Sequence, residues 1–148
     1  MTDYRYLIDN NALTALSKSQ RASRFFRKHC RIPDEVLHEA RGFPDIGDLE
    51  ALRYETTTDV LCFLITIMAT VPVTDTALVD LYADRGNADP LIIACALEAR
   101  SRDEDKLFGP VWVVVSDDAA VRSKASEFDI ELRTSREFAA ILDAVQAS

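Results

Sequence analysis

The five consecutive apolar residues Val111–Val115, with the sequence VWVVV, constrain the fold of this chain more than any other feature. Four of them are β-branched valines, which favour an extended backbone. A strand with one solvated face alternates apolar and polar residues, so an unbroken apolar run predicts a strand that is covered on both faces. Such strands are typical of parallel sheets that carry helices on both sides.

Helices and strands are expected to alternate along the rest of the chain. Apolar periodicity and capping residues predict strands at 4–8, 31–33, 71–73, 111–115 and 130–132, and helices at 11–27, 34–41, 48–53, 57–69, 74–83, 89–100, 118–128 and from 134 onward. Segment 57–69 is compatible with a strand or a helix, and we interpret it as a helix because of its length. The pattern predicts one domain over residues 1–148, a three-layer α/β/α sandwich with a mostly parallel central sheet.

The composition favours a compact intracellular protein. Hydrophobic residues make up 48% of the 148, with only four glycines and five prolines. The three cysteines, Cys30, Cys62 and Cys95, form no C-x-x-C pair, which fits a reducing cytoplasm. The start of the chain lacks a secretion signal, and the apolar run 60–73 is 14 residues, short of the roughly 17–25 that a membrane span needs. We therefore expect a cytoplasmic protein that does not enter a membrane.

The net charge of −8 is unevenly distributed. Residues 1–42 carry eight basic and five acidic side chains, whereas residues 43–118 carry five and fifteen. The first segment holds a basic run without an intervening acid, Lys18, Arg21, Arg24, Arg27, Lys28 and Arg31. Their spacing predicts a basic helical face that can contact RNA phosphates, with a solvated face or a surface for an acidic partner as alternatives.

Acidic residues follow the predicted strands. Asp9 comes after the first strand, Asp75 after the third, and Asp117 and Asp118 after VWVVV, while Asp89 opens a helix before Pro90. Ligands of open parallel sheets bind beyond the carboxyl ends of the strands, so these are candidate site residues. Each also lies at a helix N-terminus, where aspartate is favoured as a cap.

Glu39 is the acid that capping does not explain. It lies inside the predicted helix 34–41 and borders the face that packs on the sheet. An acid there is either a salt-bridged edge residue or a ligand. Carboxylates that converge at one end of a sheet repel each other unless a cation neutralises them, and a site of oxygen ligands alone suits Mg²⁺ or Mn²⁺.

Four segments together resemble the PIN-domain ribonucleases. They are residues 6–11 (YLIDNN), a strand ending in an acid, then 32–40 (IPDEVLHEA), a helix that supplies a glutamate, 86–97 (GNADPLIIACAL), an aspartate opening an apolar helix, and 113–118 (VVVSDD), a strand followed by Ser-x-Asp. They occur in the order of the family's motifs and cover most of the chain.

The resemblance implies a metal-dependent ribonuclease. In it, Asp9, Glu39, Asp89 and Asp118 would be the catalytic residues and would hold Mg²⁺ or Mn²⁺, with Asp117 as an auxiliary ligand. Asn11 and Ser116 would orient a ligand or the phosphate, and Arg85, Arg24, Arg27 and Lys28 would contact the RNA; for Asn11, capping is the alternative. It also implies a homodimer through the 45–69 region and, for a toxin of the VapC type, an antitoxin partner.

Other α/β classes fit less well. A phosphoacceptor receiver domain needs an acid pair after the first strand, and a haloacid-dehalogenase-like phosphatase needs Asp-x-Asp there, but Asp9 is followed by Asn10 and Asn11. Three alternatives stay open: a toxin, a stand-alone RNA-processing enzyme, and a catalytically silent PIN-like module that a protein partner regulates.

Overall fold

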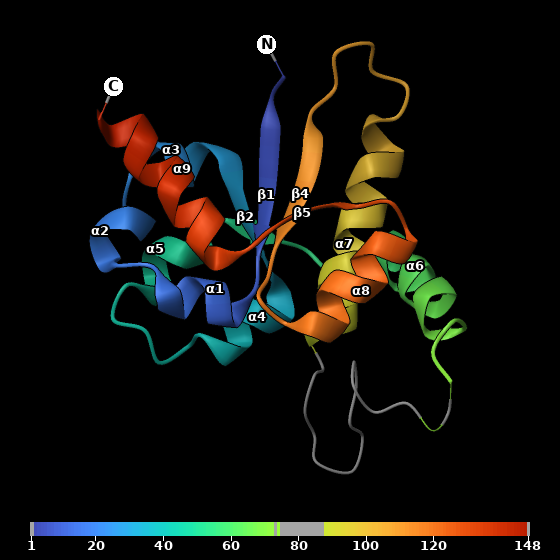
Figure 1. Cartoon of the computed structure of the whole chain (residues 1–148). Helices are drawn as coiled ribbons and strands as arrows, with labels where there is room; N and C mark the ends of the chain where they lie inside the picture. Colours follow the sequence, from blue (N-terminus) through green and yellow to red (C-terminus); the bar gives the residue numbers. More distant parts are fainter. Residues whose placement is uncertain (1, 73, 75–87, 148) are drawn as a thin grey trace.

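The structure is a computed structural model that describes residues 2–72, 74 and 88–147 (Figure 1). At its centre is a parallel sheet with the strand order β3-β2-β1-β4-β5. The strands are β1 (Tyr4–Ile8), β2 (Cys30–Pro33), β3 (Arg53–Tyr54), β4 (Val111–Val115) and β5 (Glu131–Arg133). The longest pairing joins the two central strands β1 and β4 over five residues, from Tyr4 opposite Val111 to Ile8 opposite Val115.

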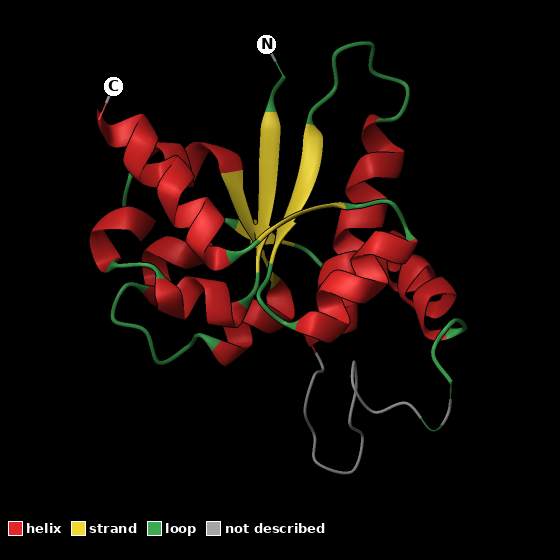
Figure 2. Cartoon of the chain, viewed as in Figure 1, coloured by secondary structure: helices red, strands yellow, loops and turns green. Residues whose placement is uncertain are grey.

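Helices cover both faces of this sheet (Figures 1 and 2). The helices are α1 (Asn10–Ala15), α2 (Lys18–Arg21), α3 (Arg24–His29), α4 (Asp34–Glu39), α5 (Ile46–Glu50), α6 (Thr58–Met68), α7 (Ala88–Asp103), α8 (Ala119–Glu127) and α9 (Ser135–Ala147). One buried apolar cluster joins the sheet to α1, α3, α4, α5 and α9, and a second joins it to α6, α7 and α8. The predicted three-layer α/β/α architecture is therefore confirmed.

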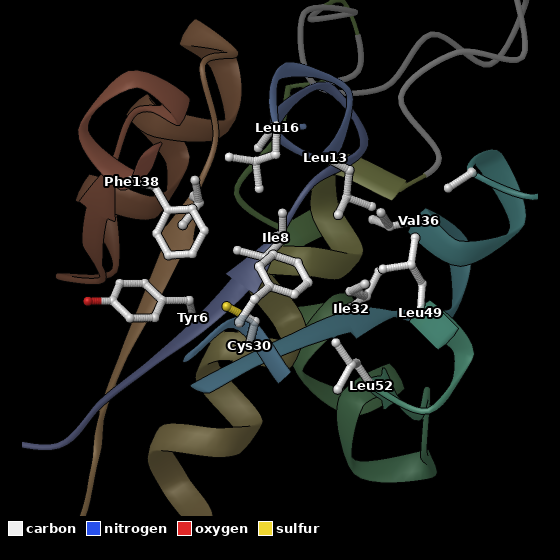
Figure 3. Packing of buried hydrophobic residues seen from close by; sticks show 14 of the residues in the cluster. Tyr6, Ile8, Leu13, Leu16, Cys30, Ile32, Val36, Leu49, Leu52 and Phe138 are labelled. Atoms are coloured by element: carbon white, nitrogen blue, oxygen red, sulfur yellow. The ribbon is translucent and has the colours of Figure 1, made fainter. Parts of the chain in front are cut away.

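Alternate strand residues enter the two clusters. In β4, Val113 and Val115 pack into the first cluster and Val114 into the second, and all three are fully buried. Figure 3 shows the first cluster, where the rings of Tyr6 and Phe138 lie side by side with their centroids 4.9 Å apart. The prediction that VWVVV is covered on both faces is confirmed for these residues, because no side of β4 faces water there.

The predicted helix 11–27 is wrong, because the segment forms three short helices, α1, α2 and α3. Ser17 and Gln20 make a capping box, in which the Gln20 N–H donates to Ser17 Oγ at 3.1 Å and the Ser17 N–H donates to Gln20 Oε1 at 2.8 Å. Ser23 then caps α3 by accepting from the Phe26 N–H at 3.2 Å. Both serines offer the backbone hydrogen bonds that restart a helix in a new direction.

Other boundaries also differ from the sequence predictions. The predicted helix 48–53 is α5 followed by the strand residues Arg53 and Tyr54, and Val71 and Pro72 are not in a strand. The predicted helix 57–69 is confirmed as α6, whereas α7 runs on to Asp103, three residues beyond its expected end. Val73 and the predicted helix 74–83, apart from Thr74, lie outside the described residues.

A buried ion pair fixes the region between α2 and α5. The Arg21 guanidinium donates to both carboxylate oxygens of Asp45, at 2.9 and 3.0 Å, and the two side chains are 9% and 6% exposed. Arg21 also donates to the Leu16 carbonyl at 2.7 Å and lies over the Phe43 ring. The hydrogen bonds from Arg21 to the Asp45 carboxylate hold the pKa of Asp45 below its usual range. Arg21 therefore belongs to the fold and not to the basic face predicted for RNA.

We expect Asp45→Ala to destabilise the protein by about 3 kcal/mol, since it leaves a buried guanidinium without its partner. The exposed Asp48 of α5, three residues further along the chain, is the matched control, and Asp48→Ala should change stability by less than about 0.5 kcal/mol. Because the folded-state pKa of Asp45 is lowered, its contribution is present above the unfolded pKa of about 3.9 and is lost as the pH falls through the folded value. Urea unfolding at pH 7 measures the loss of stability in each of the two variants. Equal losses in Asp45→Ala and Asp48→Ala would contradict the assignment of a stabilising buried ion pair.

Candidate functional site

The strand order places a topological switch point between β1 and β4. From β1 the chain continues outward to β2 and β3, whereas from β4 it continues to β5 on the other side. The helices that follow these two strands pack on different faces of the sheet, and in open α/β sheets ligands bind beyond the carboxyl ends of the strands at such a point. Asp9 directly follows β1 and Ser116 directly follows β4, and the Asp9 N–H donates to the Val115 carbonyl at 3.3 Å.

Asp9 is a buried carboxylate at this point, with 7% of the residue exposed. Its Oδ1 accepts from the Ala12 N–H at 2.7 Å and so caps α1, and its carboxylate is hydrogen-bonded to the Ser116 side chain. Burial raises the pKa of Asp9 in spite of these bonds, and the negative charges of Asp117 and Asp118 raise it further. The fold therefore fixes the position of the Asp9 carboxylate by hydrogen bonds, but no cationic side chain of the described residues is paired with it.

Asp117 and Asp118 differ in their surroundings. Asp118 caps α8 through Oδ1, which accepts from the Val121 N–H at 3.0 Å, and no described residue donates to its Oδ2. Asp117 accepts hydrogen bonds from the Ser135 hydroxyl and, at 2.8 Å, from the Ser135 N–H, and these lower its pKa. Both oxygens of Asp117 therefore accept hydrogen bonds from the start of α9, whereas one oxygen of Asp118 accepts none from the described residues.

Glu39 lies within electrostatic reach of Asp9. Glu39 is the last residue of α4, and it is exposed to solvent. Partial desolvation raises the pKa of its carboxyl, and the charges of Glu35 and Asp9 raise it further, while His38 acts in the opposite direction. Ends of β1, β4 and α4 thus bring Asp9, Asp118 and Glu39 to one edge of the sheet.

The fourth predicted acid, Asp89, is the second residue of α7. The N-terminus of α7 lies at the same edge of the sheet as the starts of α1 and α8 (Figure 1). The side chain of Asp89 and all of Arg85 lie outside the described part of the chain. Within that part, no group of three or more His, Cys, Asp or Glu side chains is placed to hold a metal ion.

Asn10 is a site neighbour that the sequence prediction missed. Its amide Oδ1 is buried and accepts no hydrogen bond from the residues described, a rare condition in folded proteins. Its position next to Asp9 is the signal that was available. The predicted Asn11 is exposed and follows it in the first turn of α1, whereas the predicted Ser116 is fully buried and accepts from the Asp118 N–H at 3.1 Å.

Two of the predicted basic contacts, Arg27 and Lys28, lie away from the acids. Arg27 and Lys28 are at the end of α3, which leads into the amino end of β2, and Arg5 donates to the Lys28 carbonyl at 2.8 Å. That end of the sheet is separated from Asp9 by the length of β1, about 16 Å for five residues. Arg24, at the start of α3, is exposed. The structure therefore brings the acids together and keeps Arg27 and Lys28 apart from them.

No protein-family model matches the sequence, and no curated protein matches it closely enough to count as a relative. Among the helices described, none is both long enough and apolar enough to cross a membrane.

We expect Asp9→Asn to raise the melting temperature by a few degrees at pH 7 in metal-free buffer. The raised pKa means that the folded state binds the proton more tightly than the unfolded chain, so stability falls as the pH rises through that interval. Asparagine keeps the capping oxygen and removes the charge.

The difference in melting temperature between Asp9→Asn and the wild type should disappear near pH 3, where the wild-type Asp9 carboxyl is protonated in both the folded and the unfolded state. Asp48→Asn, at an exposed carboxylate, should leave the melting temperature unchanged at both pH values. An Asp9→Asn variant that melts below the wild type at pH 7 would show that the Asp9 charge stabilises the metal-free fold.

Proposed function

We propose that this protein is an endoribonuclease that depends on Mg²⁺ or Mn²⁺ and acts through Asp9, Glu39, Asp89 and Asp118. The observation that carries the proposal is the buried Asp9 at the switch point, whose pKa is raised by burial and by the charges of Asp117 and Asp118. A fold that keeps acids together in this way calls for a bound cation at neutral pH. The resemblance of four ordered segments to the PIN-domain ribonucleases supplies the reaction class.

The donor set fits a magnesium-type ion. Mg²⁺ keeps several of its waters and is usually held by only one or two carboxylates together with substrate phosphates, so a closed cage of three carboxylates is not required. Asp9 and Asp118 would bind the ion, because their Cα positions are fixed by β1 and β4 and each acid is oriented by a helix cap. Glu39 and Asp89 would hold its waters or a second ion. When bound, such an ion lowers the pKa of a water and stabilises charge on phosphoryl oxygens.

The neighbouring polar groups have separate roles in this proposal. The Ser116 hydroxyl is tied to Asp9 and to the Asp118 N–H, so it orients both acids. Asn11 is exposed in the first turn of α1, where its amide can meet a phosphate. Asp117, bound to Ser135, would be an auxiliary ligand only if that contact opens. Arg27 and Lys28 would contact an RNA substrate only if the RNA chain extends past the acids to the opposite edge of the β-sheet.

The alternative is a catalytically silent PIN-like module. The bonds that occupy both oxygens of Asp117, together with the lack of a three-residue metal group among the described side chains, favour it. Cleavage assays decide between the two. The proposal includes both a toxin with an antitoxin partner and a stand-alone RNA-processing enzyme.

The purified protein should cleave single-stranded RNA in the presence of Mg²⁺ or Mn²⁺, and excess chelator should stop the reaction. Asp9→Asn and Asp118→Asn should each lower the rate about a hundredfold or more, equivalent to about 2.7 kcal/mol in activation free energy, because each removes a ligand charge. Asp48→Asn is the matched control and should cleave like the wild type. Equal cleavage by all variants, or cleavage that persists in chelator, would contradict the nuclease proposal.

A homodimer through α6 is part of the same proposal. Leu61 and Ile65 lie one turn apart on this helix and are 45% and 71% exposed, within the region expected to serve dimerisation. Ile65→Glu should convert a dimer into a monomer in sedimentation measurements, whereas Thr66→Glu, at the next exposed position, should not. A wild-type protein that sediments as a monomer at high concentration would contradict this part.

A further inference from the structure

A cavity of about 520 Å³ lies at the edge of the sheet opposite the acids. Its walls come from the amino half of β1 and β4, from β2 and β3, and from the carboxyl end of α7, which lies beside the amino ends of the strands (Figure 1). Arg5 on β1 and Trp112 on β4 are paired across the sheet and both line it. The cavity has no part in the proposed nuclease site.

Five cationic side chains line this cavity, and two of them, Arg31 and Arg102, donate no hydrogen bond to a carboxylate of the residues that the structure describes. Arg31 is half-buried and donates only to backbone carbonyls, that of Cys30 at 2.7 Å and that of Arg27 at 3.4 Å. The guanidinium of Arg102 is 3.7 Å from Glu98 and 3.9 Å from Asp103, both beyond a good hydrogen bond. A half-buried guanidinium without a counter-charge favours an anionic ligand.

The other three cations of the cavity are already paired with carboxylates, and the first of them, Arg53, donates to Asp34. Lys106 donates to Asp103 at 2.8 Å, and Arg5 is paired with Asp3 at 3.2 Å. The carboxylate of Glu98 accepts from the Tyr54 hydroxyl. Arg31 and Arg102 are therefore the two cations of the cavity with capacity to bind an anion.

Two aromatic rings are held rigidly at the same place. Trp112 and Tyr54 meet edge to face with their centroids 5.7 Å apart, and the Arg102 guanidinium lies 5.7 Å from the centre of the Tyr54 ring. The indole N–H of Trp112 donates to Asp103 at 2.8 Å, which fixes the ring orientation. Fixed aromatic surfaces beside arginine are typical of sites that stack a nucleic-acid base.

We propose that this cavity binds a nucleotide, with its phosphate at Arg31 and Arg102 and its base against Trp112. The volume lies within the roughly 300–1,000 Å³ of small-molecule sites and exceeds the needs of an inorganic anion. Arginine pairs with phosphate through two parallel hydrogen bonds, which lysine does not provide. The source of the nucleotide is either a free mononucleotide or one unit of an RNA chain. The site is independent of the proposed nuclease activity.

The chain contains a single tryptophan, so its fluorescence reports on this cavity directly. We expect adenosine or uridine monophosphate, added to the Asp9→Asn protein in chelator, to change the Trp112 emission saturably, with excitation at the red edge of the indole band to avoid absorption by the nucleotide. Arg31→Gln should weaken the binding at least tenfold, or about 1.4 kcal/mol. Arg102→Gln, at a largely exposed side chain, should weaken it too, which protects the test against a folding defect in the first variant.

Arg136→Gln, at an exposed arginine of α9, is the matched control and should leave the mononucleotide titration unchanged. A single-stranded RNA hexamer that binds at least tenfold more tightly than the mononucleotide would identify an RNA chain as the source, and equal affinities would identify the free nucleotide. The proposal is overturned by the absence of a saturable signal, by an unchanged affinity in both arginine variants, or by inorganic phosphate that binds as tightly as the nucleotide. Because hydrolysis is disabled throughout, failure here does not bear on the nuclease assay.

Discussion

The parallel pairing of β1 with β4 is the contact on which the rest of the structure depends. Both strands lie at the centre of the sheet and are apolar at the buried positions on both faces, and five consecutive residue pairs fix their register. Their carboxyl ends therefore stop at the same level, with Asp9 beside Ser116. The first turns of α1 and α8 start from this edge, so the position of the candidate site follows from how the core packs.

Each of the two central acids serves both the fold and the proposed site. One oxygen of Asp9 and one of Asp118 accept a helix N–H, which fixes the direction of each carboxylate and leaves its charge in place. Burial raises the pKa values of Asp9 and Glu39, and the charges of neighbouring acids raise them further, so this edge holds oriented carboxylates whose ionised forms are disfavoured. Capping and metal binding, which compete as explanations of the sequence, are compatible in the structure because a carboxylate has two oxygens.

Much of the architecture could be predicted from local signals. The strand at Val111–Val115, the helix capped by Asp118 and the parallel sheet follow from apolar runs and caps that depend on residues close in sequence. The two-residue strand β3 carries too few residues for a pattern, and Ser17 is compatible with both a helix interior and a cap. The burial of Arg21 depends on Asp45, 24 residues away. The cavity around Trp112 and Arg31 joins distant strands, so no local sequence pattern predicts it.

The central claim is that the acids at the switch point bind a divalent cation, and a titration with MnCl₂ followed by thermal melting tests it most directly. A ligand that binds only the folded state stabilises it by about 2.7 kcal/mol at a concentration one hundred times its dissociation constant. The melting temperature of the wild type should therefore rise with Mn²⁺ concentration and saturate, while Asp9→Asn and Asp118→Asn should respond little and Asp48→Asn like the wild type. A wild type that does not respond, or one that responds no more than Asp9→Asn, would contradict the account.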